Sequence, residues 1–282
     1  MKETKELIMQ VVFLLTACMS ILAVILICVF MFSNGLPAIA EIGPLKFLLG
    51  QKWKPNNNIF GILPMIIGSI YVTAGAILIG VPIGLLCAIF MAKFCPAKLY
   101  RFLKPAIDLL AGIPSIVYGF FGLVVIVPLM QTLFGGSGKG ILTASLLLGI
   151  MILPTIISVT ETSIRAVPES YYEGALALGA TKERSVFCAV MPGARSGITA
   201  GVILGTGRAI GETMAVVMVA GNSAVMPDSL LSGVRTLTAN IVLEMGYAAD
   251  LHRDALIATA VVLFVFILII NLLFSLLKRK EG

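Results

Sequence analysis

Two oppositely charged residues, Arg208 and Glu212, lie within an apolar stretch of the chain, residues 198–220, that is long enough to cross a membrane. Their spacing of four residues predicts that both side chains lie on one face of a helix. A charge at the centre of a bilayer costs about 2.5 kcal/mol or more, so such residues usually face a pathway or a partner. Gly201 and Gly205 continue the same face, and we expect them to leave room beside the charges.

An arginine at this depth predicts an anion site, because its planar fork of donors matches a tetrahedral oxyanion. An ionised carboxylate only accepts hydrogen bonds. Glu212 could therefore accept a bond from an anion that keeps a proton near neutral pH, as phosphate does, and would repel a fully ionised anion such as sulfate. The alternative is an Arg208–Glu212 pair that neutralises itself and locks two helices together.

A second informative segment, residues 165–197, predicts a short helix, a tight turn and another short helix; we call it the cytoplasmic hairpin. Pro168 suits a helix start, and Gly179 suits a helix end at which the chain turns left-handed. Thr181 can cap the following helix, and Pro192 is expected to stop it. An exposed knob of this kind is suited to docking in a groove on another protein.

Membrane-spanning helices must position these two motifs. The chain is 59% hydrophobic and 12% charged, whereas a soluble domain is about 45–50% apolar and about 25% charged. Segments that can cross about 30 Å of hydrocarbon at about 1.5 Å per residue are candidate spans. Six are predicted: 7–32, 66–92, 105–130, 141–164, 198–220 and 255–277.

The distribution of basic residues predicts the orientation of the chain. Lysine and arginine are denser at both termini, in 93–104 and in 165–197 than in the other connections, which places these segments in the cytoplasm. The first span is too long for a cleaved signal peptide. We therefore predict an all-α integral membrane protein with six transmembrane helices and both termini cytoplasmic. Residues 1–65 would form a transmembrane helix and an external segment, and residues 66–282 a five-helix core with the cytoplasmic hairpin.

The cytoplasmic hairpin resembles the signature of ABC importer permeases, E-A-A-x3-G-x9-I-x-L-P. The corresponding positions of this chain are Glu173, Gly174, Ala175, Gly179 and Pro192. The chain departs from the signature at Gly174, Ala189 and Met191, where the residues are still small or apolar. The resemblance implies the type I ABC importer permease fold and a hairpin that couples to a cytoplasmic ABC ATPase.

The segment 208–222 resembles the fifth span of phosphate permeases of the PstC type, and 111–119 resembles a segment shared by the two phosphate permease subunits. The resemblance implies the pore-forming permease subunit of an ATP-driven importer of inorganic phosphate that works by alternating access. It places Arg208, Glu212 and Thr213 in the substrate pathway.

With the hairpin, the resemblance covers most of the chain from about Pro64 to the C-terminus. It implies a heterodimer with a sister permease of the PstA type, a cytoplasmic ABC ATPase dimer and an extracytoplasmic phosphate-binding protein. It also implies a multi-pass protein in the lipid bilayer of a bacterial or archaeal cytoplasmic (inner) membrane. No nucleic-acid partner is expected.

We expect no ATP site, cofactor, metal site or catalytic residue in this chain, with ATP and magnesium held by the partner ATPase. The glycine-rich run 135–140 fails the phosphate-loop pattern, because Leu133 occupies the first glycine position and Gly140 replaces the magnesium-binding Ser or Thr. The odd number of cysteines, without a C-x-x-C pair, argues against a disulfide framework.

Three other functions are weighed. A permease for another oxyanion, molybdate or sulfate, would share the arginine chemistry. A passive anion channel would conduct without ATP and would not need the cytoplasmic hairpin. A membrane-embedded enzyme is disfavoured, because no predicted span holds a histidine, a Ser–Lys pair or paired aspartates.

Three further residues are assigned ordinary roles. Trp53, between Lys52 and Lys54, is expected to be an interfacial anchor. Asp108 and Glu161 are expected to be solvated at the cytoplasmic ends of their helices.

Overall fold

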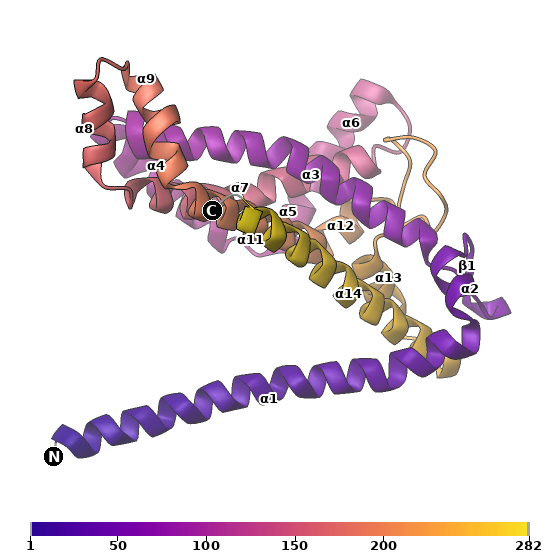
Figure 1. The fold of residues 1–282 in the computed structure, drawn as a ribbon. Helices are drawn as coiled ribbons and strands as arrows, with labels where there is room; N and C mark the ends of the chain where they lie inside the picture. The colour runs from indigo at the N-terminus through magenta and orange to yellow at the C-terminus, as the bar shows by residue number, and fades with distance from the viewer. Residues whose placement is uncertain (1, 281–282) are drawn as a thin grey trace.

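The structure is a computed structural model that describes residues 2–280 and is almost entirely helical (Figure 1). Five of the described helices are long and apolar enough to cross a membrane, and the number becomes six if one bent helix pair counts as a single span. The predicted all-α membrane architecture is therefore confirmed.

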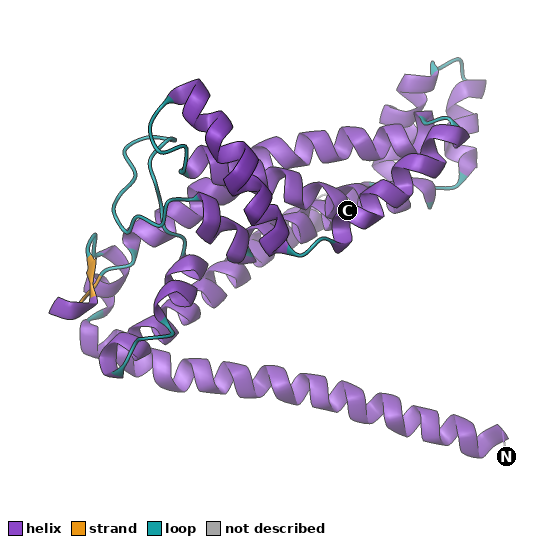
Figure 2. Ribbon diagram, turned by 180° about the vertical axis from the view of Figure 1, so that it is seen from behind, coloured by secondary structure: helices purple, strands orange, loops and turns teal. Residues whose placement is uncertain are grey.

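Four of the predicted spans correspond to long helices. They are α1 (Lys2–Ile42), α3 (Leu63–Ile89, continued by the π-helical turn η2, Phe90–Phe94), α7 (Ile141–Arg165) and α14 (Asp250–Lys280). The free end of α1 and the C-terminal end of α14 both lie toward one end of the molecule (Figure 1 and Figure 2). This common direction agrees with the orientation inferred from the basic residues.

The third predicted span, 105–130, is wrong in its position. The chain forms a separate helix α4 (Ala97–Gly112), and the helix that can cross the membrane is Ser115–Phe134. The break lies at Ile113, whose ψ of 127° is extended because the ring of Pro114 excludes the helical conformation from the residue before it. The span is built from α5 (Ser115–Phe121), the π-helical turn η3 (Gly122–Ile126) and α6 (Val127–Phe134).

The fifth predicted span, 198–220, is broken. It consists of α11 (Arg195–Gly211) and the short helix α12 (Met214–Val219), with Glu212 and Thr213 between them. Before α11, the helical segment Lys182–Gly193 meets it at an angle of 76°.

The cytoplasmic hairpin forms the predicted two helical segments and turn, but Pro192 does not stop the second segment, which runs through it to Gly193 before the chain bends into α11. It comprises α8 (Glu169–Ala177), α9 (Lys182–Ser185), the π-helical turn η4 (Val186–Val190) and α10 (Met191–Gly193). Gly179 has a φ of +85°, and the Thr181 hydroxyl accepts a hydrogen bond from the Arg184 backbone N–H. In Figure 1, α8 and α9 project at the end of the molecule toward which α1 and α14 point.

The opposite end carries the small elements (Figure 2). They are α2 (Pro44–Leu49), the antiparallel strands β1 (Trp53–Lys54) and β2 (Ile59–Phe60), the 3-10 turn Pro55–Asn57 and α13 (Leu237–Glu244). We call this the outer end, because the cytoplasmic hairpin marks the inner one.

Helix α7 lies at the centre of the core, with Leu147, Met151 and Ile156 fully buried. Helices α3 and α11 pack closely on it through glycines, which allow helices in a membrane to approach each other. A Cβ atom on Gly80 would lie 2.7 Å from Ile152, and one on Gly205 would lie 2.7 Å from Ile156. The three helices α3, α7 and α11 are therefore closely packed, and α11 carries the charged segment.

Candidate functional site

The candidate site is the break in the fifth span. Helix α11 ends at Gly211, and Glu212 follows with extended backbone angles, φ −68° and ψ 133°. Arg208 and Glu212 therefore do not lie on one helical face, and that prediction is wrong. The spacing rule assumes a continuous helix, and the helix ends between the two residues.

Glu212 is fixed by its neighbours at the break. Its Oε1 accepts a hydrogen bond of 3.1 Å from the backbone N–H of Ala215, in the first turn of α12. Its carbonyl accepts a bond of 3.0 Å from the Thr238 hydroxyl on α13. The Thr213 hydroxyl donates to the carbonyl of Gly211 at 3.2 Å. The conformation of the break is thus set by side chains as well as by the backbone.

Arg208 is half-buried in the last turn of α11, and its guanidinium donates a hydrogen bond of 3.2 Å to the Thr155 hydroxyl on α7. Within residues 2–280, no carboxylate forms an ion pair with it. The alternative of a self-neutralising Arg208–Glu212 pair is therefore wrong. Arg208 and Glu212 are thus four residues apart in the sequence and form no ion pair with each other.

Glycines leave open space beside Arg208, but they are not the glycines that the sequence predicts. Gly201 and Gly205 pack against Thr160 and Ile156 of α7. Gly207 and Gly211 instead face open space, since a Cβ atom built on either would have no described atom within 4 Å. The turn of α11 that carries Arg208 therefore has a side, at Gly207 and Gly211, that the described part of the chain leaves uncovered.

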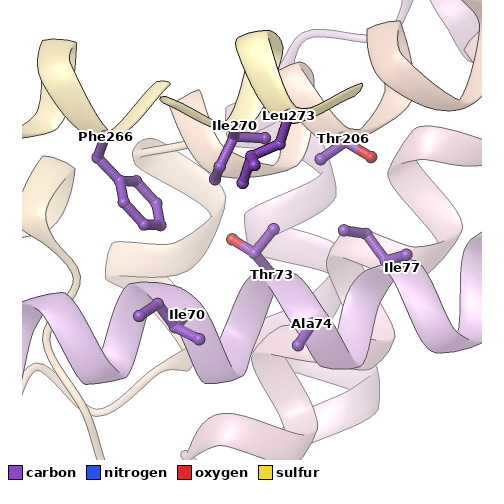
Figure 3. Close-up of a pocket in the computed structure, with 8 residues that line it drawn as sticks. All are labelled: Ile70, Thr73, Ala74, Ile77, Thr206, Phe266, Ile270 and Leu273. Carbon is purple, nitrogen blue, oxygen red and sulfur yellow. The ribbon is translucent and has the colours of Figure 1, made fainter. Parts of the chain in front are cut away.

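A separate pocket of about 360 Å³ lies between α3, α11 and α14. Side chains of α3 and α14 face each other across it (Figure 3). Its polar lining consists of the hydroxyl-bearing Thr73 and Thr206, and the rest is apolar, including Phe266 and Ile270. Because it lacks a cation to offset the cost of desolvating an anion, it is not the anion site.

The cytoplasmic hairpin presents its signature residues on an exposed surface. Helix α8, which carries Glu173, Gly174 and Ala175, has no buried residue. Just beyond it Leu178 is 91% exposed, and a Cβ on Gly179 would have open space around it. An exposed large apolar residue on a cytoplasmic knob is a typical anchor for a protein partner. Nothing in the spacing of the signature had singled out Leu178.

A buried carboxylate joins α4 to α7 at the cytoplasmic side. Glu161 is 1% exposed and accepts bonds of 2.7 Å from the Tyr100 hydroxyl and 2.7 Å from Arg165, with Lys104 at 3.1 Å. Arg165 also donates to the carbonyl of Met91 at 2.8 Å. The expected solvation of Glu161 is therefore wrong, because the basic end of α4 folds back over it.

This contact changes the acidity of the α4 groups. The pKa of Tyr100 is raised, mainly because its hydroxyl donates to the carboxylate of Glu161. Burial favours the neutral amine of Lys104, but the hydrogen bond and charge of Glu161 outweigh it and raise the pKa. Both groups keep their protons at neutral pH, so the contact between α4 and α7 persists there. Asp108 lies 3.4 Å from Lys104, and its side chain is largely exposed, which is closer than Glu161 to the predicted solvation.

A second buried carboxylate organises the outer end. Glu244 accepts hydrogen bonds from the indole N–H of Trp53 at 2.8 Å and from Arg235, and it lies 2.9 Å from the His252 ring. Trp53 is only 8% exposed and packs edge-on against Phe60. The predicted interfacial anchor is therefore wrong, because Trp53 is a core residue of the outer end.

Comparisons with known proteins agree with this architecture. The family described as "Binding-protein-dependent transport system inner membrane component" matches residues 80–281. A probable ABC transporter permease protein YqgH of Bacillus subtilis is 38% identical over 280 residues, 95% of this chain and 90% of the relative. The phosphate transport system permease protein PstC of Mesorhizobium japonicum is 39% identical over 261 residues, 85% of this chain and 80% of the relative.

Solved structures are similar in fold. A chain of the MetNI methionine ABC transporter, in an inward-facing conformation, superimposes with a TM-score of 0.64 and 19% identity over 82% of this chain and 100% of that chain. A chain of a bacterial alginate ABC transporter superimposes with a TM-score of 0.65 and 14% identity over 94% of both chains. At this identity they bear on the fold alone, and the predicted type I ABC importer permease fold is confirmed.

Proposed function

Because the chain belongs to the family of binding-protein-dependent transport system inner membrane components, we propose that it is the pore-forming permease subunit of an ATP-driven importer of inorganic phosphate. Relatives named as PstC phosphate permeases, such as that of Mesorhizobium japonicum, support the substrate. The observation that carries the chemistry is the guanidinium of Arg208, half-buried in a broken span and without a counter-charge among the described residues.

Arg208 would bind the anion as it crosses. A guanidinium has five donors, and the described structure uses one of them on Thr155. The remaining donors can bind phosphate oxygens in a bidentate manner. The cost of placing an unpaired charge in the membrane then falls when the anion is present, because the two charges offset each other.

Glu212 would discriminate between anions. Its Oε1 is occupied by Ala215, whereas its Oε2 has no hydrogen-bond partner in the described part of the chain. That oxygen can accept a hydrogen bond from the hydroxyl of a phosphate ion, which keeps at least one proton near neutral pH. It would repel a fully ionised oxyanion. Thr213, adjacent in the same break, would complete the polar surface of the pathway.

The cytoplasmic hairpin would couple this pathway to ATP. Glu173, Gly174, Ala175, Gly179 and Pro192 lie on or beside the exposed knob that would dock on an ABC ATPase dimer, which holds ATP and magnesium. Closure of the ATPase would move the hairpin and switch access to the site. The uncovered side of α11 at Gly207 and Gly211 would face a sister permease of the PstA type. A phosphate-binding protein would deliver substrate at the outer end, and the assembly would lie in the cytoplasmic membrane.

The test is transport by the reconstituted complex. The chain, its sister permease and the ATPase are assembled in proteoliposomes and supplied with phosphate-loaded binding protein. Uptake of radiolabelled phosphate that requires both ATP and the binding protein is expected. Uptake of molybdate or sulfate in its place would favour the other oxyanion permeases, and phosphate flux without ATP would indicate a passive channel.

A further inference from the structure

Lys93 connects the cytoplasmic hairpin to the end of α3. It lies in the π-helical turn η2, and its ammonium is 2.8 Å from the carboxylate of Glu169. The same ammonium lies 5.1 Å from the ring centre of Tyr172. Glu169 and Tyr172 are three residues apart on α8 and therefore on one face of it. One cation thus holds two side chains of the helix that carries the signature.

This contact is well placed to transmit a force. The Lys93 side chain is only 11% exposed, whereas the Glu169 side chain is 59% exposed. The cation is therefore buried against the body of the protein, whereas its carboxylate partner lies on the exposed hairpin. Helix α8 has no buried residue of its own, so its packing on the rest of the chain is light. An ion pair and a cation–π contact are significant for such a helix.

Helix α3 leads from Lys93 to the outer side of the candidate site. It is packed tightly on α7, as Gly80 and Gly84 illustrate. Near its other end, the Ser69 hydroxyl accepts a hydrogen bond of 3.0 Å from the backbone N–H of Leu237. The next residue, Thr238, donates to the carbonyl of Glu212. A continuous series of contacts therefore runs from the hairpin through α3 and α13 to the break in the fifth span.

We propose that Lys93 is a positioning residue that attaches α8 to α3, so that movement of the hairpin on the ATPase displaces α3 and, through Ser69 and Thr238, the conformation of Glu212. This inference rests on the proposed function and adds to it the route by which ATP hydrolysis reaches the site. Coupling of this kind is carried by packed elements, and α3 is closely packed on α7 along its length. The π-helical turn at Lys93 is a local irregularity of a type that often occurs at functional positions.

The test measures coupling rather than activity alone. Lys93→Met keeps the length of the side chain and removes the charge, Lys93→Arg keeps the charge, and Glu169→Gln removes the partner on the exposed side. We expect Lys93→Met and Glu169→Gln to lower the phosphate imported per ATP hydrolysed by about tenfold, the scale of a typical coupling free energy. Lys93→Arg should recover most of it. The amount of assembled complex, measured by size-exclusion chromatography, should stay the same.

The matched control is Lys98→Met, because Lys98 is exposed on the same cytoplasmic side and has no ion pair among the described residues. It should import phosphate at the wild-type ratio. The inference is overturned if Lys93→Met and Glu169→Gln keep the wild-type ratio. It is also overturned if their uptake falls only in proportion to lost complex and Lys93→Arg does not restore it. Failure of the proposed function is distinguishable, since the wild-type complex itself would then import no phosphate.

Discussion

Arg208 is the residue on which the proposed transport chemistry depends. Its one described hydrogen bond is to a neutral hydroxyl, that of Thr155, and the glycines at 207 and 211 leave space around it. In a lipid environment an arrangement of this kind is costly unless water or an anion reaches the guanidinium. Water must therefore reach the guanidinium, and the affinity of the site for the anion must be low enough to release it again.

Glu212 should determine which oxyanion passes. In Glu212→Gln the amide oxygen can still accept the bond from Ala215, so the break keeps its shape, but the repelling charge is lost. We expect discrimination between phosphate and sulfate to fall roughly ten- to a hundredfold, the equivalent of one hydrogen bond to a charged group. Competition of sulfate with radiolabelled phosphate in proteoliposomes measures it. Unchanged selectivity would refute the role given to this carboxylate.

The residues next to Trp53 led to a wrong prediction of its environment. Its flanking lysines suggested the membrane interface, yet the indole is buried and bound to Glu244. The acceptor lies 191 residues away in the chain, so no local pattern could have indicated it.

Trp53→Phe should therefore destabilise the outer end. The phenyl ring keeps most of the apolar contact, while a buried bond to a charged acceptor is lost, which costs about 1.5–3 kcal/mol. The midpoint of thermal unfolding in detergent should fall by several degrees. Tyr247→Phe is the control, since Tyr247 is 70% exposed and touches His252 only through its ring. Equal midpoints for the two variants would contradict the assignment of Trp53 to the core.

At the scale of elements, the sequence predicted the spans that are continuous and missed the points at which helices end. Length and hydropathy identified α1, α3, α7 and α14, because a run of apolar residues is sufficient to define a long helix in lipid. The third span was displaced because the amphipathic helix α4 contains apolar residues that merge with the following span. Pro114, which separates them, lies inside the predicted span 105–130.

The break at Glu212 was beyond local prediction for a different reason. Hydropathy does not report backbone conformation, and the helix ends here with support from the Thr238 hydroxyl, 26 residues away. The chemistry of Arg208 and Glu212 therefore identified them as candidates, whereas the prediction that they lie on one helical face was wrong. The cytoplasmic hairpin was predicted more fully, since its turn depends on Gly179 and on a cap within the same short segment.

The turn at Gly179 gives a prediction for the hairpin. Its φ of +85° is strained for a β-branched residue by about 1–2 kcal/mol, although the surrounding space would admit the side chain. Gly179→Val should therefore distort the knob and abolish ATP-driven uptake while the permease still assembles. Gly136→Val is the control, because Gly136 has a φ of +71° and open space at an outer turn. Normal uptake by Gly179→Val would instead favour a passive channel.

The cytoplasmic hairpin and the outer end lie far apart in the molecule and are connected by packed helices. The cytoplasmic hairpin, with α8 and α9, lies at one end, and α2 and β1 lie at the other, as Figure 1 and Figure 2 show. The break in the fifth span receives contacts from both α7 and α13. A relative movement of the two ends would therefore change the positions of Arg208 and Glu212, as alternating access requires.

The side of α11 next to Arg208 must be accessible to water if this account is correct. A direct measurement is the reaction of Gly207→Cys with a charged, membrane-impermeant thiol reagent, applied to the assembled complex. The native cysteines, Cys18, Cys28, Cys87, Cys95 and Cys188, are first replaced by serine or alanine. Ala209→Cys is the control, since Ala209 is 3% exposed and packed in the core.

We expect Gly207→Cys to react in at least one nucleotide state and phosphate to slow the reaction, whereas Ala209→Cys should not react. A thiol at position 207 that remains unmodified from both sides of the membrane in every nucleotide state would contradict the proposed pathway.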